Sequence, residues 1–410
     1  SEMLRGQVGT SFKLTVQRPG TKKPLEFDIV RRSIQLPFIP YYGKLEHQIG
    51  YINLSTFSGN PSKEFKQAFL DLKKQGITSL VIDLRNNGGG LLDESIEIAN
   101  FFVPRGKTLV TTKGRIAQAS NTYKTLREPL DLDIPLVVLV NGGTASSSEI
   151  LAGSLQDLDR AVIIGTRTFG KGLVQTTRPL PYGATMKLTT SKYYIPSGRC
   201  VQAIDYKHRN EDGSVGRIPD SLTTVFHTAA GREVRDGGGV TPDITVEPEK
   251  LPNILFYLVN DNLVFDYATQ YCWTHQAPAS VAEFKLTDDD YEAFKTLVKS
   301  RDFTYDRQSE KMLKSLKEMA EFEGYMDGAK EEFAALEKKL NHNLDRDLET
   351  FKKQISEYLS QEIITRYFYQ RGAAMERLKD DDDLESAVKV LQNKAEYAKI
   401  LSVPEETKSE

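Results

Sequence analysis

The pattern of apolar and polar residues changes character twice along the chain, near residue 33 and near residue 249. Before residue 33, short stretches alternate with a period of two residues, which is typical of half-buried strands. This stretch is too short to enclose a core of its own. We therefore expect three zones, residues 1–33, 34–248 and 249–410.

The middle zone, 34–248, alternates between two kinds of pattern. Near-continuous apolar runs predict strands that are buried on both faces, and segments with helical spacing lie between them. The predicted strands cover residues 49–54, 79–84, 136–140, 161–164 and 186–190. The predicted helices cover residues 61–72, 94–101 and 149–158. Such alternation of strands and helices predicts an α/β layer architecture.

The last zone, 249–410, is poor in glycine and rich in lysine and glutamate at helical spacing. Amphipathic helices are predicted over 310–321, 330–340 and 348–373, and Thr287 followed by three aspartates predicts a helix start. We interpret the acidic run Asp380–Asp383 as a solvated helix boundary rather than an acidic binding element. We expect this helical domain to serve as a scaffold or an oligomer contact.

Composition narrows the functional classes. The chain has 410 residues, of which 39% are hydrophobic and 27% charged, as expected for a folded protein of two or three domains. A net charge of −3 gives no electrostatic basis for binding nucleic acid or an anionic membrane. The longest apolar run, Leu136–Val140, is too short to span a bilayer. Cys200 and Cys272 form no CxxC pair, and no metal or cofactor is expected.

Three glycines, Gly88 to Gly90, follow the predicted strand 79–84 and precede a predicted helix. Glycine permits a positive φ, and successive backbone amides in such a loop can bind an anion. The segment is therefore either an oxyanion hole or an ordinary strand-to-helix turn. Taken alone, its residues slightly favour the ordinary turn.

A serine cluster, Ser146 to Ser148, opens the predicted helix that follows strand 136–140. Ser146 at a helix N-terminus lies at the positive end of the helix dipole, which stabilises negative charge on its oxygen. However, Ser146-x-x-Glu149 also matches a capping box, which needs no catalysis. For this segment alone, capping is the favoured interpretation.

Lys171 lies in the glycine-rich segment Gly165–Gly172, which nearly matches a phosphate-binding P-loop. That motif requires Ser or Thr after the lysine and then a helix, whereas this chain has Gly172 and a strand-like segment. Serine with lysine, without a nearby histidine, is instead the minimum set for acyl transfer. Such a lysine must be uncharged, and Gln175 could orient it without adding negative charge. The alternative is that Gln175 is an ordinary surface residue of a strand.

The five histidines are scattered, and neither HExxH nor G-x-S-x-G occurs. We interpret the histidines as structural, while a triad assembled only in space stays open.

Four motifs occur in the order found in the C-terminal processing peptidases, also called tail-specific proteases. They span residues 83–92, 141–150, 168–175 and 236–243, and together they make the chain resemble this family. The resemblance implies a crotonase-like α/β core and a serine endopeptidase that cleaves unfolded or tagged polypeptides near their C-termini. It implies a Ser-Lys dyad and an acyl-enzyme, with no cofactor.

The resemblance also implies a role for each matching residue. Ser146 would be the nucleophile, Lys171 the general base and Gln175 the residue that orients the lysine. The amides of Gly89 and Ser147 would form the oxyanion hole. Family members often carry alanine where Ser147 stands, so the nucleophile among the three serines is assigned from register.

Residues 1–33 resemble the last third of a PDZ domain, which implies that further sequence lies upstream of Ser1. The family resemblance implies a bacterial cell-envelope location, polypeptide substrates recognised at their C-termini, and a homo-oligomer formed through the helical C-terminal domain. Two alternatives stay open. One is a catalytically degenerate peptide-binding relative, and the other is a crotonase-like acyl-thioester enzyme that uses the Gly88–Gly90 amides.

Overall fold

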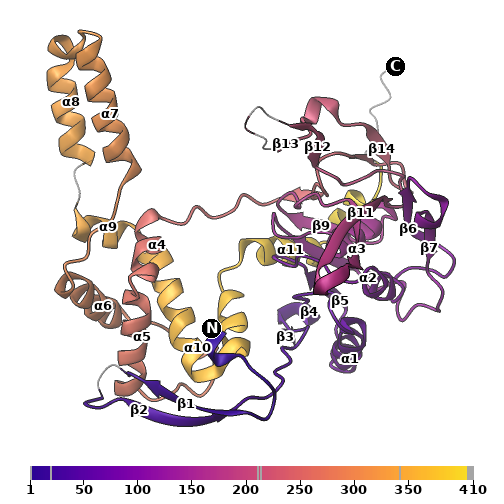
Figure 1. Ribbon diagram of the computed structural model, residues 1–410, viewed down its shortest axis with the longest axis horizontal. Coiled ribbons are helices and arrows are strands. Elements are labelled where there is room, and N and C mark those ends of the chain that lie inside the picture. The colour runs from indigo at the N-terminus through magenta and orange to yellow at the C-terminus, as the bar shows by residue number, and fades with distance from the viewer. Residues whose placement is uncertain (1, 19–20, 210–211, 213–214, 341–342, 404–410) are drawn as a thin grey trace. The chain divides into compact units, whose positions relative to one another are not determined.

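The computed structural model describes residues 2–18, 21–209, 212, 215–340 and 343–403 (Figure 1). The chain divides into two compact units, each built from two segments. One comprises Ser1–Ile34 with Glu249–Lys379, and the other Gln35–Pro248 with Asp380–Glu410. Residues of the first and last predicted zones thus fall in one unit. The segment after residue 379, however, groups with the α/β core and not with the other C-terminal helices.

The first unit contains a hairpin of β1 (Ser11–Val16) and β2 (Leu25–Val30) and seven helices within its described residues. The helices are α4 (Asn253–Asn260), α5 (Leu263–Thr274), α6 (Asp288–Ser300), α7 (Gln308–Phe322), α8 (Met326–Leu340), α9 (Leu344–Thr350) and α10 (Lys352–Arg377). Apolar side chains of α4, α5, α6, α9 and α10 form its core. Thr287 caps α6 through a capping box with Asp290, which confirms the predicted helix start.

The second unit is built on a six-stranded sheet with the order β16-β9-β8-β5-β4-β3. Its strands are β3 (Tyr41–Lys44), β4 (Ile49–Asn53), β5 (Ser79–Asp83), β8 (Leu136–Val140), β9 (Val162–Gly165) and β16 (Ile244–Thr245). All neighbouring pairs are parallel except β3 with β4. Strands β5, β8 and β9 are entirely buried, as their apolar runs predict.

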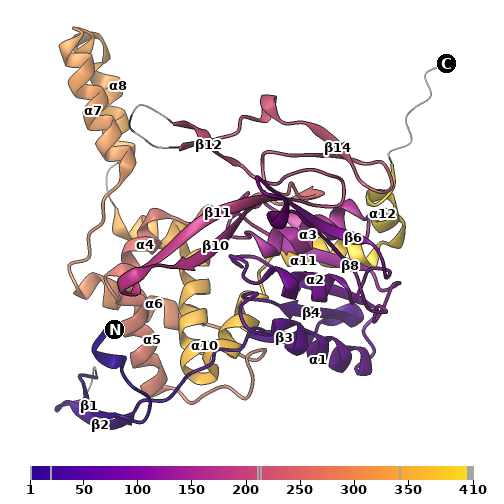
Figure 2. The ribbon, with the colours of Figure 1, turned by 45° about the vertical axis from the view of Figure 1, so that its right-hand side comes forward.

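Helices cover both faces of this sheet (Figure 2). Helices α1 (Pro61–Lys74), α2 (Leu92–Ala99) and α3 (Ser147–Asp157) share one apolar core with alternate strand residues such as Leu80, Val138 and Ile163. Because successive strand residues point to opposite faces, the equally buried Val137 and Ile164 face the other side.

The C-terminal segment covers that other side. Helix α11 (Asp382–Gln392) contacts β8 and β9 and buries Leu384, Ala387, Val390 and Leu391. Helix α12 (Lys394–Ile400) follows, and Tyr397 exchanges two hydrogen bonds with the backbone of Leu136 at the start of β8. The segment therefore completes the core, which explains why it groups with this unit.

A second sheet has the order β10-β11-β6-β7. Its strands are β6 (Thr108–Gly114), β7 (Asn121–Lys124), β10 (Leu173–Pro179) and β11 (Thr185–Tyr194). Two further strand pairs are β12 (Ile204–Arg209) with β13 (Val215–Arg217), and β14 (Val225–His227) with β15 (Glu233–Arg235). The predicted α/β class is thus confirmed as a mixed α/β fold with a helical C-terminal part.

Candidate active site

Three of the sequence motifs meet at one edge of the main sheet. Strands β5, β8 and β9 are adjacent and parallel, so their carboxyl ends lie side by side. The glycine loop follows β5, the serine turn follows β8, and the loop to Lys171 follows β9. The carboxyl edge of a parallel sheet is where α/β proteins bind ligands.

Ser146 occupies a sharp turn between β8 and α3. Its backbone has φ 59° and ψ −118°, a conformation that side-chain-bearing residues seldom adopt. Ser147 is buried and donates to Gly90 O at 3.0 Å, while the fully buried Ser148 donates to Asn87 O at 2.9 Å. Ser146 is only partly buried, and its hydroxyl donates to no described residue. Of the three serines, it alone presents a hydroxyl proton that is not already committed.

Glu149 ties the serine turn to the lysine loop. Ser146 is the N-cap residue of α3, and the Glu149 side chain forms its half of the expected capping box, while the Ser146 side chain makes no cap hydrogen bond. The same buried carboxylate accepts hydrogen bonds from four groups: Ser146 N at 2.9 Å, Thr168 Oγ1 at 2.6 Å, Gly170 N at 2.7 Å and Lys171 N at 2.8 Å. Burial raises the pKa of the Glu149 carboxyl, although these donors oppose the shift.

One further side chain and one backbone hydrogen bond reinforce this junction. The hydroxyl of Tyr193, on β11, donates to Ser146 O at 3.2 Å and also to Lys171 O. Burial raises the pKa of Tyr193 well above its ordinary value, so the phenol stays a donor. Thr144 O accepts from Phe169 N at 3.0 Å. Sequence reasoning missed Tyr193, because no local pattern distinguishes it from any other strand tyrosine.

The glycine loop lies against the serine turn. Gly89 has φ 93°, and a Cβ there would lie 2.8 Å from Ser146 Cβ and 2.9 Å from Ser147 N. Only glycine fits this position. The amide of Gly89 donates to Asn87 Oδ1 at 2.9 Å, whereas the amides of Gly88 and Ser147 donate to no described residue. In this conformation the Ser147 amide is therefore unengaged, whereas the Gly89 amide is already bonded.

Lys171 lies two residues before β10, and its side chain is partly buried. No ion pair or hydrogen bond joins its amine to Ser146, to Gln175 or to any other described residue. Gln175 is exposed on β10, next to an irregularity in the pairing of β10 with β11. Lys171 lies outside β10, so the two residues do not share one strand. Their predicted roles stay predictions.

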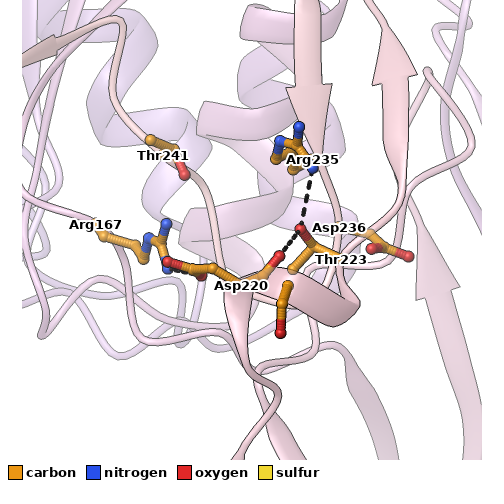
Figure 3. A pocket seen from close by; sticks show the side chains of 7 residues that line it. Arg167, Asp220, Thr223, Arg235, Asp236 and Thr241 are labelled. Carbon is orange, nitrogen blue, oxygen red and sulfur yellow. Dashed lines mark hydrogen bonds and ion pairs between the residues drawn. The ribbon is translucent and has the colours of Figure 1, made fainter.

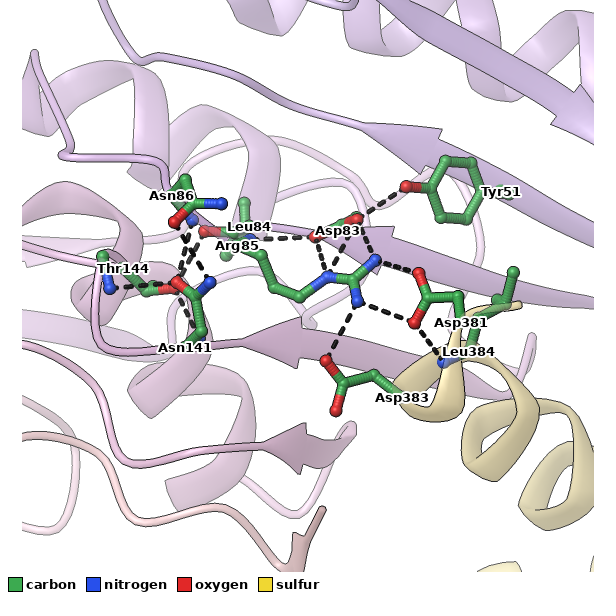
Figure 4. Close-up of polar contacts among 11 residues, drawn as sticks. Tyr51, Asp83, Leu84, Arg85, Asn86, Asn141, Thr144, Asp381, Asp383 and Leu384 are labelled. Atoms are coloured by element: carbon green, nitrogen blue, oxygen red, sulfur yellow. Dashed lines mark hydrogen bonds and ion pairs between the residues drawn. The ribbon is translucent and has the colours of Figure 1, made fainter. Parts of the chain in front are cut away.

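A charged cluster lies beside the glycine loop (Figure 4). Arg85 binds Asp83 and also two carboxylates of the C-terminal segment, Asp381 and Asp383, with shortest contacts of 2.7, 2.6 and 2.9 Å. Tyr51 Oη donates to Asp83 Oδ2 at 2.6 Å. The interpretation of Asp380–Asp383 as a solvated boundary is wrong for two of its four residues, because these two side chains face a buried guanidinium.

A cavity of about 430 Å³ lies in the same unit (Figure 3). It is lined by Arg167, Asp220, Ser221, Thr223, Arg235, Asp236 and Thr241. Arg167 is paired with Asp220 at 2.7 Å, and none of the predicted site residues lines the cavity.

The described residues carry neither a metal-ligating cluster nor a membrane-spanning helix. They contain no group of three His, Cys, Asp or Glu side chains placed to hold a metal ion. None of the helices in the described ranges has the length and apolar character needed to cross a bilayer.

Known families resemble two parts of this chain. Residues 48–208 match the model of peptidase family S41. Residues 254–391 match the family described as "Probable PDZ-protease, C-terminal helical domain". The second match includes α11, although contacts group that helix with the α/β core.

Individual relatives carry corresponding names. The chain is 40% identical over 207 residues to the carboxy-terminal-processing protease of Bartonella bacilliformis, covering 50% of this chain and 47% of that protein. It is 35% identical over 267 residues to a "Probable CtpA-like serine protease" of Staphylococcus aureus, covering 63% of this chain and 46% of that protein. The chain thus spans about half the length of the curated relatives it matches.

A solved structure, the photosystem II D1 C-terminal processing protease, is 30% identical with a TM-score of 0.41. That match covers 60% of this chain and 58% of the other. The name of the Bartonella relative agrees with the resemblance to the C-terminal processing peptidases.

Proposed function

We propose that this chain is a serine endopeptidase of the C-terminal processing type, which cleaves unfolded or tagged polypeptides near their C-termini. The observation that carries the proposal is the state of Ser146. It combines a positive φ at a strand-to-helix turn with a partly exposed hydroxyl that donates to no described residue. Strained backbone of this kind gathers at functional sites, and a sharp strand-to-helix turn presents a nucleophilic serine to its substrate.

In the proposed reaction, Lys171 Nζ accepts the proton of Ser146 Oγ as this oxygen bonds to the scissile carbonyl carbon. The electron pair of the carbonyl moves to its oxygen, which backbone amides stabilise. Collapse of this intermediate breaks the C–N bond, and Lys171 returns the proton to the leaving amine. Water, deprotonated by Lys171, then hydrolyses the acyl-enzyme and regenerates Ser146.

Two adjustments convert the observed geometry into a productive one. The Lys171 side chain turns toward Ser146, and Gln175 comes within reach of the amine to orient it. On the oxyanion side, Ser147 N is already unengaged. Either the Gly89 amide releases Asn87 Oδ1 or the neighbouring Gly88 amide supplies the second donor. Catalytic hydrogen bonds commonly tighten only when substrate binds.

The test is cleavage of an unstructured protein by single variants. Ser146→Ala and Lys171→Ala should each abolish cleavage, and the double variant should be no worse, because the dyad acts as a unit. Ser147→Ala is the matched control, since it removes only one hydrogen bond, worth about 1 kcal/mol. It should keep most of the wild-type rate.

Cleavage at the wild-type rate by Ser146→Ala or by Lys171→Ala would refute the dyad. A wild-type chain that binds peptides without cutting them would point to a degenerate relative. Turnover of an acyl-CoA would instead favour the acyl-thioester alternative.

The finer features of the fold belong to the same proposal. We infer a crotonase-like core for residues 34–248 and the last third of a PDZ domain for residues 1–33, where the hairpin β1–β2 lies. The proposal further includes a homo-oligomer formed through the helical C-terminal part and a location in the bacterial envelope. Both rest on the family resemblance.

A further inference from the structure

The Arg85 cluster joins parts of the chain that are almost 300 residues apart in sequence. Asp381 binds the guanidinium in a two-point contact, with Nη1 at 2.8 Å from Oδ1 and Nη2 at 2.6 Å from Oδ2. Asp383 Oδ2 accepts from Nη1 at 2.9 Å. The side chains of Arg85, Asp381 and Asp383 are 18%, 10% and 20% exposed, so water has little access to these contacts. Such two-point contacts fix the orientation of a guanidinium as well as its position.

Arg85 directly precedes the loop that faces Ser146. Its neighbour Asn86 has φ 60° and exchanges two hydrogen bonds with the side chain of Asn141, at 2.9 and 3.1 Å. On the other side of Arg85, Leu84 O accepts from Thr144 Oγ1 at 2.9 Å. Figure 4 shows this path from Asp381 and Asp383 through Arg85 to Asn141 and Thr144. Ser146 follows two residues after Thr144.

The charges in this cluster do not balance. One guanidinium faces three carboxylates, those of Asp83, Asp381 and Asp383. Burying such a group costs desolvation energy and brings like charges together, so the cluster is a poor source of stability. Removing one carboxylate still leaves Arg85 two partners. A positional role therefore explains this arrangement better than a stabilising one.

We propose that Asp381 and Asp383 are positioning residues of the active site, which hold the glycine loop against the Ser146 turn through Arg85. The C-terminal segment is then part of the catalytic unit rather than an appended scaffold. This inference rests on the proposed peptidase function. Asp381 and Asp383 touch neither Ser146 nor Lys171, and they act only through Arg85.

The substitution Asp381→Asn is well matched to this question. Asp381 is also the N-cap of α11, where its side chain accepts from Leu384 N at 3.1 Å. Asparagine caps a helix as well as aspartate does, so the substitution removes the charge and keeps the cap. The exposed Asp380 and Asp382, in the same acidic run, provide control substitutions to asparagine.

The experiment compares Asp381→Asn, Asp383→Asn, the double variant and the two controls in the full chain. We expect kcat of the double variant to fall about tenfold to a hundredfold, the scale of a small misplacement of catalytic groups. KM and the midpoint of thermal unfolding should stay close to wild type, and the controls should keep the wild-type kcat. Asp381→Glu, which keeps the charge, should recover part of the loss.

An unchanged kcat in the double variant would overturn the proposal. A fall in kcat matched by an equal loss of folded protein would also overturn the proposal, because that result would show a purely structural role.

Amide hydrogen exchange provides a readout independent of activity. In the double variant, residues 86–90 and 142–147 should exchange faster than in wild type, and unchanged exchange would contradict the inference. An inactive wild-type chain would refute the proposed function, while the exchange measurement would still decide the positioning role.

Discussion

At the residue scale, Ser146 and Lys171 are held together through their backbones, while their side chains stay apart. Glu149 accepts from the amides of both residues, and the Tyr193 hydroxyl donates to the carbonyls of both. The Ser-x-x-Glu spacing was visible in the sequence, and it predicts the helix cap. The second role of Glu149 was not predictable, because it depends on the loop after β9 folding back onto α3.

Glu149→Gln should therefore destabilise the junction although the two side chains have nearly the same shape. Each Glu149 oxygen accepts two hydrogen bonds, so in either amide orientation the new NH₂ group faces donors. Each buried N–H left without an acceptor costs about 1–3 kcal/mol. Urea unfolding should show the loss. The control is Glu128→Gln, because the Glu128 side chain is largely exposed and its 3.8 Å ion pair with Arg105 is a surface pair that adds little stability.

Wild-type stability and cleavage in Glu149→Gln would contradict the role given to this carboxylate.

At the element scale, the strands that carry the site were predictable because they are buried on both faces. The runs at β5, β8 and β9 are apolar for that reason, and each ends where a motif begins. Strands β6 and β7 were not predicted, since Thr, Lys and Asn interrupt their apolar positions. The attachment of α11 to the sheet was also missed, because helical periodicity reveals an apolar face but not the surface that it covers.

The first turn of α11 should make stability depend on pH. Burial raises the pKa of the Asp383 carboxyl above its ordinary 3.8, despite the attraction of Arg85. The folded chain then binds this proton more tightly than the unfolded chain does. The contribution of Asp383 to the free energy of unfolding therefore falls as pH rises from about 4 through the raised pKa. Asp383→Asn removes this titration and should flatten the dependence. The pH dependence is measured from the unfolding midpoints of wild type and Asp383→Asn across the acidic range. The control is Asp382→Asn, which changes an exposed carboxylate of the same helix turn.

If Asp383→Asn retained the full wild-type slope over that range, the assignment of this titration to Asp383 would be wrong.

At the scale of the whole molecule, each of the two units is assembled from segments that are distant in sequence. The sequence predicted the α/β class and the helical C-terminal part. It could not predict that residues 380–403 join the unit that contains the α/β core, since Arg85 and Asp381 become neighbours only in the folded chain. The motifs located the candidate site, while the contacts of Ser147 and Ser148 distinguish Ser146 from its neighbours.

The central claim is that Ser146 is the nucleophile of a serine peptidase, and covalent labelling tests it most directly. The chain is treated with a small fluorophosphonate, its residual cleavage of an unstructured protein is measured, and the modified residue is located by peptide mass spectrometry. We predict one adduct, on Ser146, with cleavage lost in proportion to labelling. An adduct on Ser147 or Ser148 that removes activity, or an active enzyme that keeps its full rate at saturating reagent, would contradict the account.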